Sequence, residues 1–234
     1  MLFKGTHIKD LTRASIITIV LGFILLGAGT YLFAILAEEV LEREKFAIDK
    51  ALMDFVETIN SPGLQTVMGY VTEVGSVLFI SILSVLLFAY LFFFSNFSRW
   101  VAIFFAVNML GISLLTKALK LLFERERPEV LAQYDGTGFS FPSGHSTGAI
   151  TFYGFIIYLI LISPLSKAWK WTINSFLGLL AFGIAISRVF LGVHYITDIV
   201  AGLAFGLAWL LICIVALELL LWRQRRRSIR KQEA

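Results

Sequence analysis

The chain has 234 residues, of which 58% are hydrophobic and 15% are charged, and its mean hydropathy is +0.84. A soluble domain of this length is rarely so apolar, so the composition predicts a membrane protein that crosses the bilayer several times. The formal net charge is +4, but many of the basic residues flank apolar segments and do not alternate with aromatic residues, which argues against a nucleic-acid partner.

Six apolar stretches are long enough to cross about 30 Å of hydrocarbon as helices, which predicts an all-α fold. They lie at 15–37, 71–94, 99–122, 146–163, 172–190 and 196–222. The first follows Lys4, Lys9 and Arg13, as in a signal peptide. Its apolar run is too long for one and "FAILAEE" is a poor cleavage site, so we predict a retained anchor. We expect residues 1–234 to form a single membrane-integral domain.

The stretch 38–70, between the first two spans, is too polar to cross a membrane. Apolar residues recur there at helical spacing, at Ile48, Leu52, Phe55, Val56 and Ile59. This pattern predicts an amphipathic helix, which "NSPG" at 60–63 ends. Two interpretations remain open: the helix lies on the outer membrane surface, or it is a loop helix packed on the protein.

The short loops divide into a basic and an acidic set. The basic set includes the N-terminal segment, Arg99, Lys167, Lys170 and the tail at 223–234, whereas acidic residues concentrate in 38–57 and 124–135. Positive charge marks the cytoplasmic side of a membrane protein. Both termini are therefore predicted to be cytoplasmic, and the segment 38–70 and the loops near 122–145 and 188–195 are predicted to face outward.

Three polar clusters interrupt the apolar pattern near the outward ends of the predicted spans. They are "KLLFERERP" at 120–128, "FPSGHS" at 141–146 and "SRVFLGVHYITD" at 187–198. Ionisable residues at membrane depth are costly, and their first interpretation is functional. Since all three clusters fall on the same side in the six-span layout, we expect them to form one site.

The cations of these clusters are suited to a multiply charged anion. Arg127 and Arg188 present planar forks that match phosphate oxygens, and Lys120 adds a point charge. Ser143 and Gly144 stand where a helix should begin, and free N–H groups at a helix start bind phosphate. Glycine at position 144 would let the backbone approach the anion closely.

The histidines supply reactive groups. His194 and Asp198 are four positions apart and would share a helix face, so the carboxylate could hold one ring nitrogen and leave the other to act as nucleophile or base. His145 could donate a proton to a leaving oxygen. Each residue alone has a structural alternative: Arg188 could snorkel at a helix end, Ser143 could only cap a helix, and the His194–Asp198 pair could be a structural hydrogen bond. Their joint occurrence favours a phosphate site.

Three motifs in this order resemble those of the type 2 phosphatidic acid phosphatase superfamily: Lys120-x6-Arg127-Pro128, Pro142-Ser143-Gly144-His145 and Ser187-Arg188-x5-His194-x3-Asp198. The resemblance implies a membrane lipid phosphatase in which His194 attacks phosphorus and forms a phosphohistidine, Asp198 orients it and His145 protonates the leaving group. It further implies that the phosphate is held, without metal or cofactor, by Lys120, Arg127, Ser143, Gly144 and Arg188.

The substrates that the resemblance implies are lipid phosphates: undecaprenyl diphosphate, phosphatidylglycerol phosphate, phosphatidate or diacylglycerol pyrophosphate. A phosphotransferase with the same site is an alternative. An anion or proton transporter is a second one, but the polar residues sit at one end of the spans and not at the midplane, and no matching pair of broken helices is apparent.

Overall fold

The structure is a computed structural model that describes residues 13–42, 46–128 and 138–232, and no strand occurs within these ranges. Its helices are α1 (Arg13–Leu41), α2 (Ala47–Ile59), α3 (Pro62–Glu73), α4 (Val77–Ala89), a π-helical turn (Tyr90–Phe94), α5 (Arg99–Phe123), α6 (Gly144–Ile162), α7 (Lys167–Phe190) and α8 (Ile196–Gln232). The predicted all-α fold is confirmed. Lys4 and Lys9 lie outside the described residues.

Six helical segments are long and apolar enough to cross a membrane, which confirms the predicted number of spans. They are Ile19–Leu41, Pro62–Phe94, Arg99–Phe123, Gly144–Ile162, Lys167–Phe190 and Ile196–Ile229. The second segment starts earlier than predicted, because the Ser61 hydroxyl caps the N-terminus of α3 and Pro62 occupies its first position. This segment is also interrupted at 74–76, where the Ser76 side chain caps α4.

Helix α2 lies within the predicted amphipathic segment and packs on the protein. Its Val56 contacts a buried cluster that includes Val189 of α7 and Ile199 of α8. A second apolar stripe faces outward, since Ile48 is 61% exposed and Phe55 is 55% exposed. One face of α2 therefore packs on the protein, as expected of a loop helix. The other face is apolar and exposed, as expected of a helix on the membrane surface.

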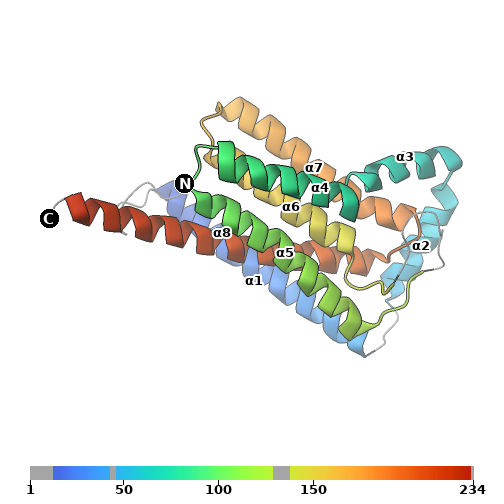
Figure 1. The fold of residues 1–234 in the computed structure, drawn as a ribbon. Coiled ribbons are helices and arrows are strands. Elements are labelled where there is room, and N and C mark those ends of the chain that lie inside the picture. Colours follow the sequence, from blue (N-terminus) through green and yellow to red (C-terminus); the bar gives the residue numbers. More distant parts are fainter. Residues whose placement is uncertain (1–12, 43–45, 129–137, 233–234) are drawn as a thin grey trace.

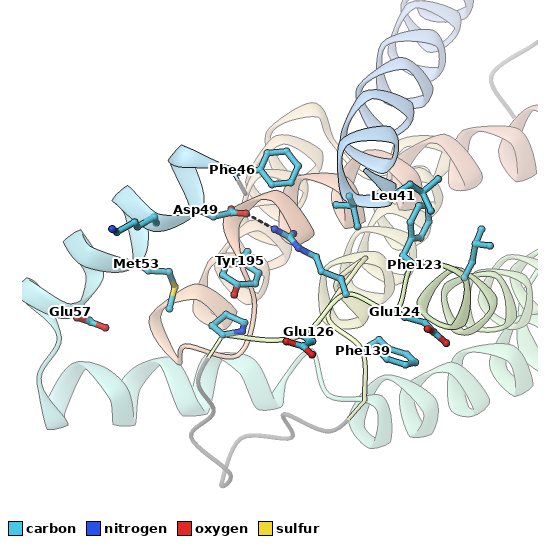
Figure 2. A pocket seen from close by; sticks show the side chains of 15 residues that line it. Leu41, Phe46, Asp49, Met53, Glu57, Phe123, Glu124, Glu126, Phe139 and Tyr195 are labelled. Atoms are coloured by element: carbon cyan, nitrogen blue, oxygen red, sulfur yellow. Dashed lines mark hydrogen bonds and ion pairs between the residues drawn. The ribbon is translucent and has the colours of Figure 1, made fainter. Parts of the chain in front are cut away.

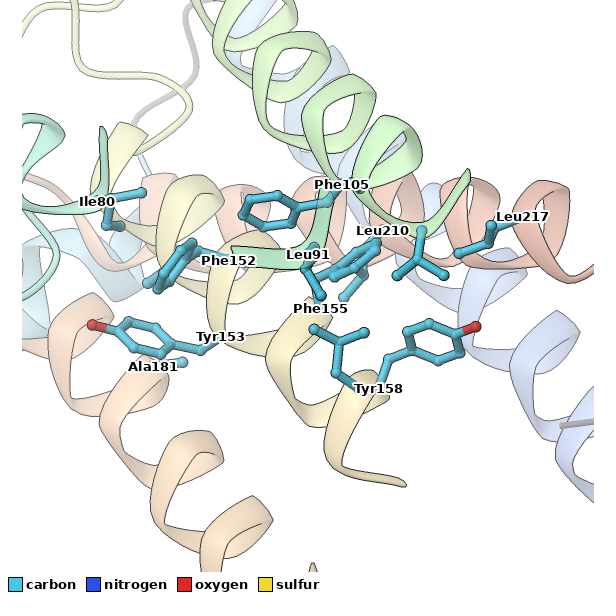
Figure 3. Close-up of a cluster of buried hydrophobic side chains, with 14 of the residues drawn as sticks. Ile80, Leu91, Phe105, Phe152, Tyr153, Phe155, Tyr158, Ala181, Leu210 and Leu217 are labelled. Carbon is cyan, nitrogen blue, oxygen red and sulfur yellow. The ribbon is translucent and has the colours of Figure 1, made fainter. Parts of the chain in front are cut away.

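The main apolar core lies where α4, α5, α6, α7 and α8 meet (Figure 3). The ring of Phe105 on α5 lies 6.2 Å from that of Phe152 and 5.2 Å from that of Phe155, both on α6. Leu210 of α8 belongs to the same buried cluster. Most of the large apolar side chains exposed outside this core lie on the six candidate spans, where a bilayer would cover them.

The helix ends that carry the three polar clusters lie at one end of the bundle. These are the end of α5, the start of α6, the end of α7 and the start of α8, and α2 and α3 lie at this same end (Figure 1). The C-terminal part of α8 projects at the opposite end. A glycine sets the approach of α8 to α6: a Cβ at Gly202 would stand 2.8 Å from the carbonyl oxygen of Ser143.

Candidate active site

The first cluster spans the C-terminal end of α5, and its side chains bind the loop that precedes α6. Glu124 ends the helix in the left-handed conformation, with φ at 47°. The ammonium of Lys120 donates to the carbonyl of Phe139 at 2.5 Å. Arg127 donates from Nε to the carbonyl of Gly138 and from Nη1 to that of Val193, each at 2.8 Å. Both predicted phosphate ligands are thus held close to the other two clusters.

The second cluster forms the N-terminus of α6. Ser143 is the N-cap, and its Oγ accepts from the N–H of Ser146 at 3.4 Å, so the predicted capping role is observed. Its own N–H donates to the carbonyl of Asp198 at 3.1 Å, which ties this turn to α8. A Cβ at Gly144 would meet only Cε of Lys120, at 3.9 Å. Packing therefore does not require glycine at position 144.

The third cluster brings His194 and Asp198 into contact, but not on one helix face as expected. Helix α8 begins at Ile196, so His194 lies in the preceding turn, where its N–H donates to the carbonyl of Arg188 at 3.3 Å. The ring Nδ1 lies 3.3 Å from Oδ2 of Asp198. Asp198 sits in the first turn of α8 and accepts the N–H of Tyr195 at 2.9 Å, so the contact spans the helix start.

Both ring nitrogens of His194 have partners that fix its tautomer. With the carboxylate of Asp198 at Nδ1, the ring proton belongs there and the lone pair lies on Nε2, which accepts from Nη1 of Arg127 at 3.2 Å. Burial lowers the pKa of His194 to about 4, although the hydrogen bond to Asp198 acts in the opposite direction. At neutral pH the ring is therefore uncharged and its Nε2 can act as a nucleophile.

Arg188 and His145 complete the set. Arg188 is only 1% exposed, so the snorkelling interpretation is wrong, and its Nη1 donates to Oγ1 of Thr72 on α3 at 2.9 Å. His145 is 7% exposed and lies within electrostatic reach of Arg188 and His194, and also of Arg127 and Lys120. The side chains that the sequence singled out therefore converge from α5, α6, α7 and α8.

Several polar side chains at the site have no counterpart in the sequence predictions. The hydroxyl of Ser140 donates to Oδ2 of Asp198 at 2.5 Å and lies 3.1 Å from Nδ1 of His194. Arg125 forms an ion pair with Oδ1 of Asp198 at 2.5 Å and another with Asp49 of α2 at 2.6 Å. Arg125 stands inside the first motif, which is the one signal that could have indicated it. Asp49 is one of many acidic residues in its segment and gave no signal.

A family model described as the PAP2 superfamily matches residues 100–222. This range is more than half of the chain and contains all three motifs. The chain belongs to the PAP2 superfamily. Within the described ranges, the structure contains no group of three or more His, Cys, Asp or Glu side chains placed to hold a metal ion.

Curated PAP2-type relatives are named as lipid phosphatases. Phosphatidylglycerophosphatase B of Bacillus subtilis (strain 168) is 34% identical over 176 residues, which is 75% of this chain and 86% of that protein. Undecaprenyl-diphosphatase of Sulfolobus acidocaldarius is 34% identical over 100 residues, 41% of this chain and 42% of that protein. Lipid A 1-phosphatase of Rhizobium johnstonii is 33% identical over 120 residues, 47% of this chain and 45% of that protein. These names confirm the prediction of a phosphoric ester hydrolase.

Solved structures agree with this assignment. The transmembrane PAP2-type phosphatidylglycerolphosphate phosphatase from Bacillus subtilis superposes with a TM-score of 0.73 at 29% identity, over 82% of this chain and 96% of that chain. LpxE from Aquifex aeolicus gives a TM-score of 0.56 at 24% identity, over 73% of this chain and 97% of that chain, which supports the fold alone. The predicted membrane-integral architecture is therefore confirmed.

Proposed function

We propose that the protein hydrolyses a phosphomonoester or pyrophosphate of a membrane lipid, without a metal ion, through a phosphohistidine at His194. The observation that carries this proposal is the environment of the His194 ring: Asp198 holds the protonated Nδ1, and Arg127 faces the Nε2 lone pair. A buried neutral imidazole oriented by a carboxylate is the arrangement expected of an activated nucleophile. The lipid phosphatase names of the relatives support the substrate class.

The reaction proceeds in two displacements at phosphorus. In the first, Nε2 of His194 forms a bond to phosphorus while the bond to the leaving oxygen breaks, and His145 gives that oxygen a proton. In the second, His145 takes a proton from water, and the water oxygen displaces Nε2 and releases inorganic phosphate. The phosphorylated ring retains its Nδ1 proton and carries positive charge, which the carboxylate of Asp198 stabilises.

The surrounding groups stabilise the transition state. Negative charge on the non-bridging oxygens is met by Lys120, Arg127 and Arg188. Arg188 is buried and the other two are partly buried, so that electrostatic interactions at the site are stronger than in water. The first N–H groups of α6, after Ser143, add the positive end of a helix dipole. Because Gly144 has no side chain, an anion can approach the N–H groups at this helix terminus. Packing does not require glycine here, since an added Cβ would make only an ordinary contact.

Phosphatidylglycerol phosphate is the first candidate among the lipid phosphates, because the relative with that activity in its name is matched over 86% of its length. We further propose that the site faces outward and that both termini are cytoplasmic. The basic residues at 223–227 on α8 lie at the end of the bundle opposite α2 and the site (Figure 1), and such residues mark the cytoplasmic side.

Phosphate release from a panel of lipids tests this proposal. The purified protein is assayed in detergent with excess chelator against phosphatidylglycerol phosphate, phosphatidate, undecaprenyl diphosphate and diacylglycerol pyrophosphate, with His194→Ala as the control. We expect release from at least one lipid by the native protein only, and inhibition by vanadate. A strict requirement for added magnesium, or label transferred from one lipid to another without free phosphate, would contradict the proposal.

A second arm of the same experiment tests the orientation. Intact cells that express the native protein or His194→Ala receive a short-chain, water-dispersible lipid phosphate that does not cross the membrane. An outward site predicts release by intact native cells above the His194→Ala background. Release that occurs only after permeabilisation would place the site on the cytoplasmic side.

A further inference from the structure

Arg125 joins the buried carboxylate of Asp198 to a second carboxylate on α2. Its guanidinium donates from Nη1 to Oδ1 of Asp198 at 2.5 Å and from Nη2 to Oδ2 of Asp49 at 2.6 Å. Figure 2 shows the ion pair of Asp49 as a dashed line at the wall of a cavity of about 1060 Å³. One planar fork therefore binds two carboxylates that are far apart in the sequence.

Thr197 closes this network at the N-terminus of α8. Its Oγ1 donates to Oδ2 of Asp49 at 2.7 Å and accepts from Nη1 of Arg125 at 2.8 Å. Its N–H donates to Oδ1 of Asp49 at 3.1 Å. Since the first N–H groups of a helix lack partners within it, Asp49 satisfies one of them from a different helix. Helix α2 is thereby fixed to the turn of α8 that carries Asp198.

The two carboxylates of the network are buried, whereas the Arg125 side chain is 14% exposed at the cavity wall. Asp49 is 4% exposed and Asp198 is fully buried. The guanidinium carbon of Arg125 lies 4.5 Å from the ring centre of Tyr195 and 5.2 Å from that of Phe46. An exposed ion pair would contribute little, but removal of one partner from a buried pair leaves an uncompensated charge.

We propose that Asp49 and Arg125 are positioning residues for the reaction. Arg125 binds Oδ1 of Asp198 so that Oδ2 faces the ring of His194, and Asp49 offsets the charge of Arg125 so that Asp198 stays available to the histidine. This inference rests on the proposed function, because the two residues act through Asp198 and His194.

The net charge of Asp49, Arg125 and Asp198 determines the direction in which each substitution shifts the protonation of His194. Asp49, Arg125 and Asp198 together carry one net negative charge, which favours a positively charged His194 ring. Without Asp49 the net charge is zero, and without Arg125 it is two negative charges. If both are neutralised, the single negative charge of Asp198 remains. Lys120 and Arg127 act on both histidines of the site, Arg188 acts on His145, and His145 and His194 act on each other. None of these groups changes in any of the variants.

Kinetics of five variants test the proposal, with phosphatidylglycerol phosphate in detergent micelles as the substrate. The variants are Asp49→Asn, Arg125→Gln, the double variant, Arg125→Lys and the control Asp54→Asn, which changes an exposed acid on the same helix. We expect Asp49→Asn and Arg125→Gln to lower kcat on the order of 10²-fold, as a misplaced catalytic group does, with a smaller change in KM. Asp54→Asn should keep native values.

The pH dependence of kcat/KM on the acid side shows whether Asp49 and Arg125 act on His194 through their charge or have only a structural role. Protonated His194 cannot attack, so this acid limb reports its pKa in the free enzyme. A less negative trio disfavours protonation, so Asp49→Asn should move the limb to lower pH. Arg125→Gln should move it to higher pH, and the double variant should return it toward the native position. Ionisation of the substrate phosphate contributes equally to all profiles.

Arg125→Lys retains the positive charge but loses the planar guanidinium that binds both carboxylates. The acid limb of its kcat/KM profile should therefore stay near the native position, while kcat falls. Vanadate inhibition of each variant checks that the site is folded. Native kcat in Asp49→Asn, or an unchanged limb in Asp49→Asn, Arg125→Gln and the double variant, would overturn the inference. These outcomes leave the proposed function intact if His194→Ala is inactive, whereas turnover by His194→Ala would instead contradict the proposed function.

Discussion

At Gly144, substitution by alanine should affect stability and catalysis differently. The nearest atom to an added Cβ is Cε of Lys120 at 3.9 Å, an ordinary contact. Gly144→Ala should therefore leave the melting temperature unchanged or slightly higher, since alanine favours a helix. If phosphate lies against the first N–H groups of α6, the same methyl group should raise KM and lower kcat/KM by at least tenfold. Native kinetics together with native stability would remove Gly144 from the phosphate site.

At this scale the sequence identified the side chains that carry charge within apolar surroundings, because such placement is costly without a function. Lys120, Arg127, Arg188 and the two histidines stood out for this reason. Asp49 and Thr72 could not be identified, since their roles depend on partners that only the fold brings near, namely Arg125 and Arg188.

At the scale of elements, the contact between α8 and the start of α6 sets the geometry of the site. A Cβ at Gly202 would stand 2.8 Å from the carbonyl oxygen of Ser143 and 3.0 Å from Cβ of Ser146. Both atoms belong to the turn that would bind phosphate, and neither can move without displacing it.

Gly202→Ala should therefore destabilise the protein by about 1–3 kcal/mol, as overpacking does, and lower kcat as well. The control is Gly178→Ala on α7, where an added Cβ meets nothing within 4 Å. Thermal unfolding in detergent and phosphate release should both distinguish the two variants. Equal melting temperatures and equal rates would show that this helix contact does not position the site.

Element boundaries were predicted less well than element number. Hydropathy located six spans, but it assigned the second to 71–94, whereas the apolar segment begins at Pro62 and is interrupted at 74–76. The caps supplied by Ser61 and Ser76 are local hydrogen bonds that an average over apolar residues cannot detect. Gly75 lies in the interruption, where an added Cβ would overlap the side chain of Ile184 on α7.

At the scale of the whole molecule, the alternation of spans already places the polar clusters at one end. If each span crosses the bilayer, the end of α5 and the start of α6 share a side with the end of α7 and the start of α8. Which helices are neighbours could not be predicted, since every span is apolar on most of its surface. The structure supplies this information through the packing of α6 against both α7 and α8.

We propose that this convergence makes His194 a nucleophile toward phosphorus. The most direct measurement is the trapping of a phosphoenzyme after brief incubation with a lipid labelled in its phosphate and an alkaline quench, which preserves a phosphorus–nitrogen bond. The native protein should carry label that mild acid removes, and His194→Ala should carry none and release no phosphate. Label on His194→Ala, or native phosphate release by that variant, would contradict the account.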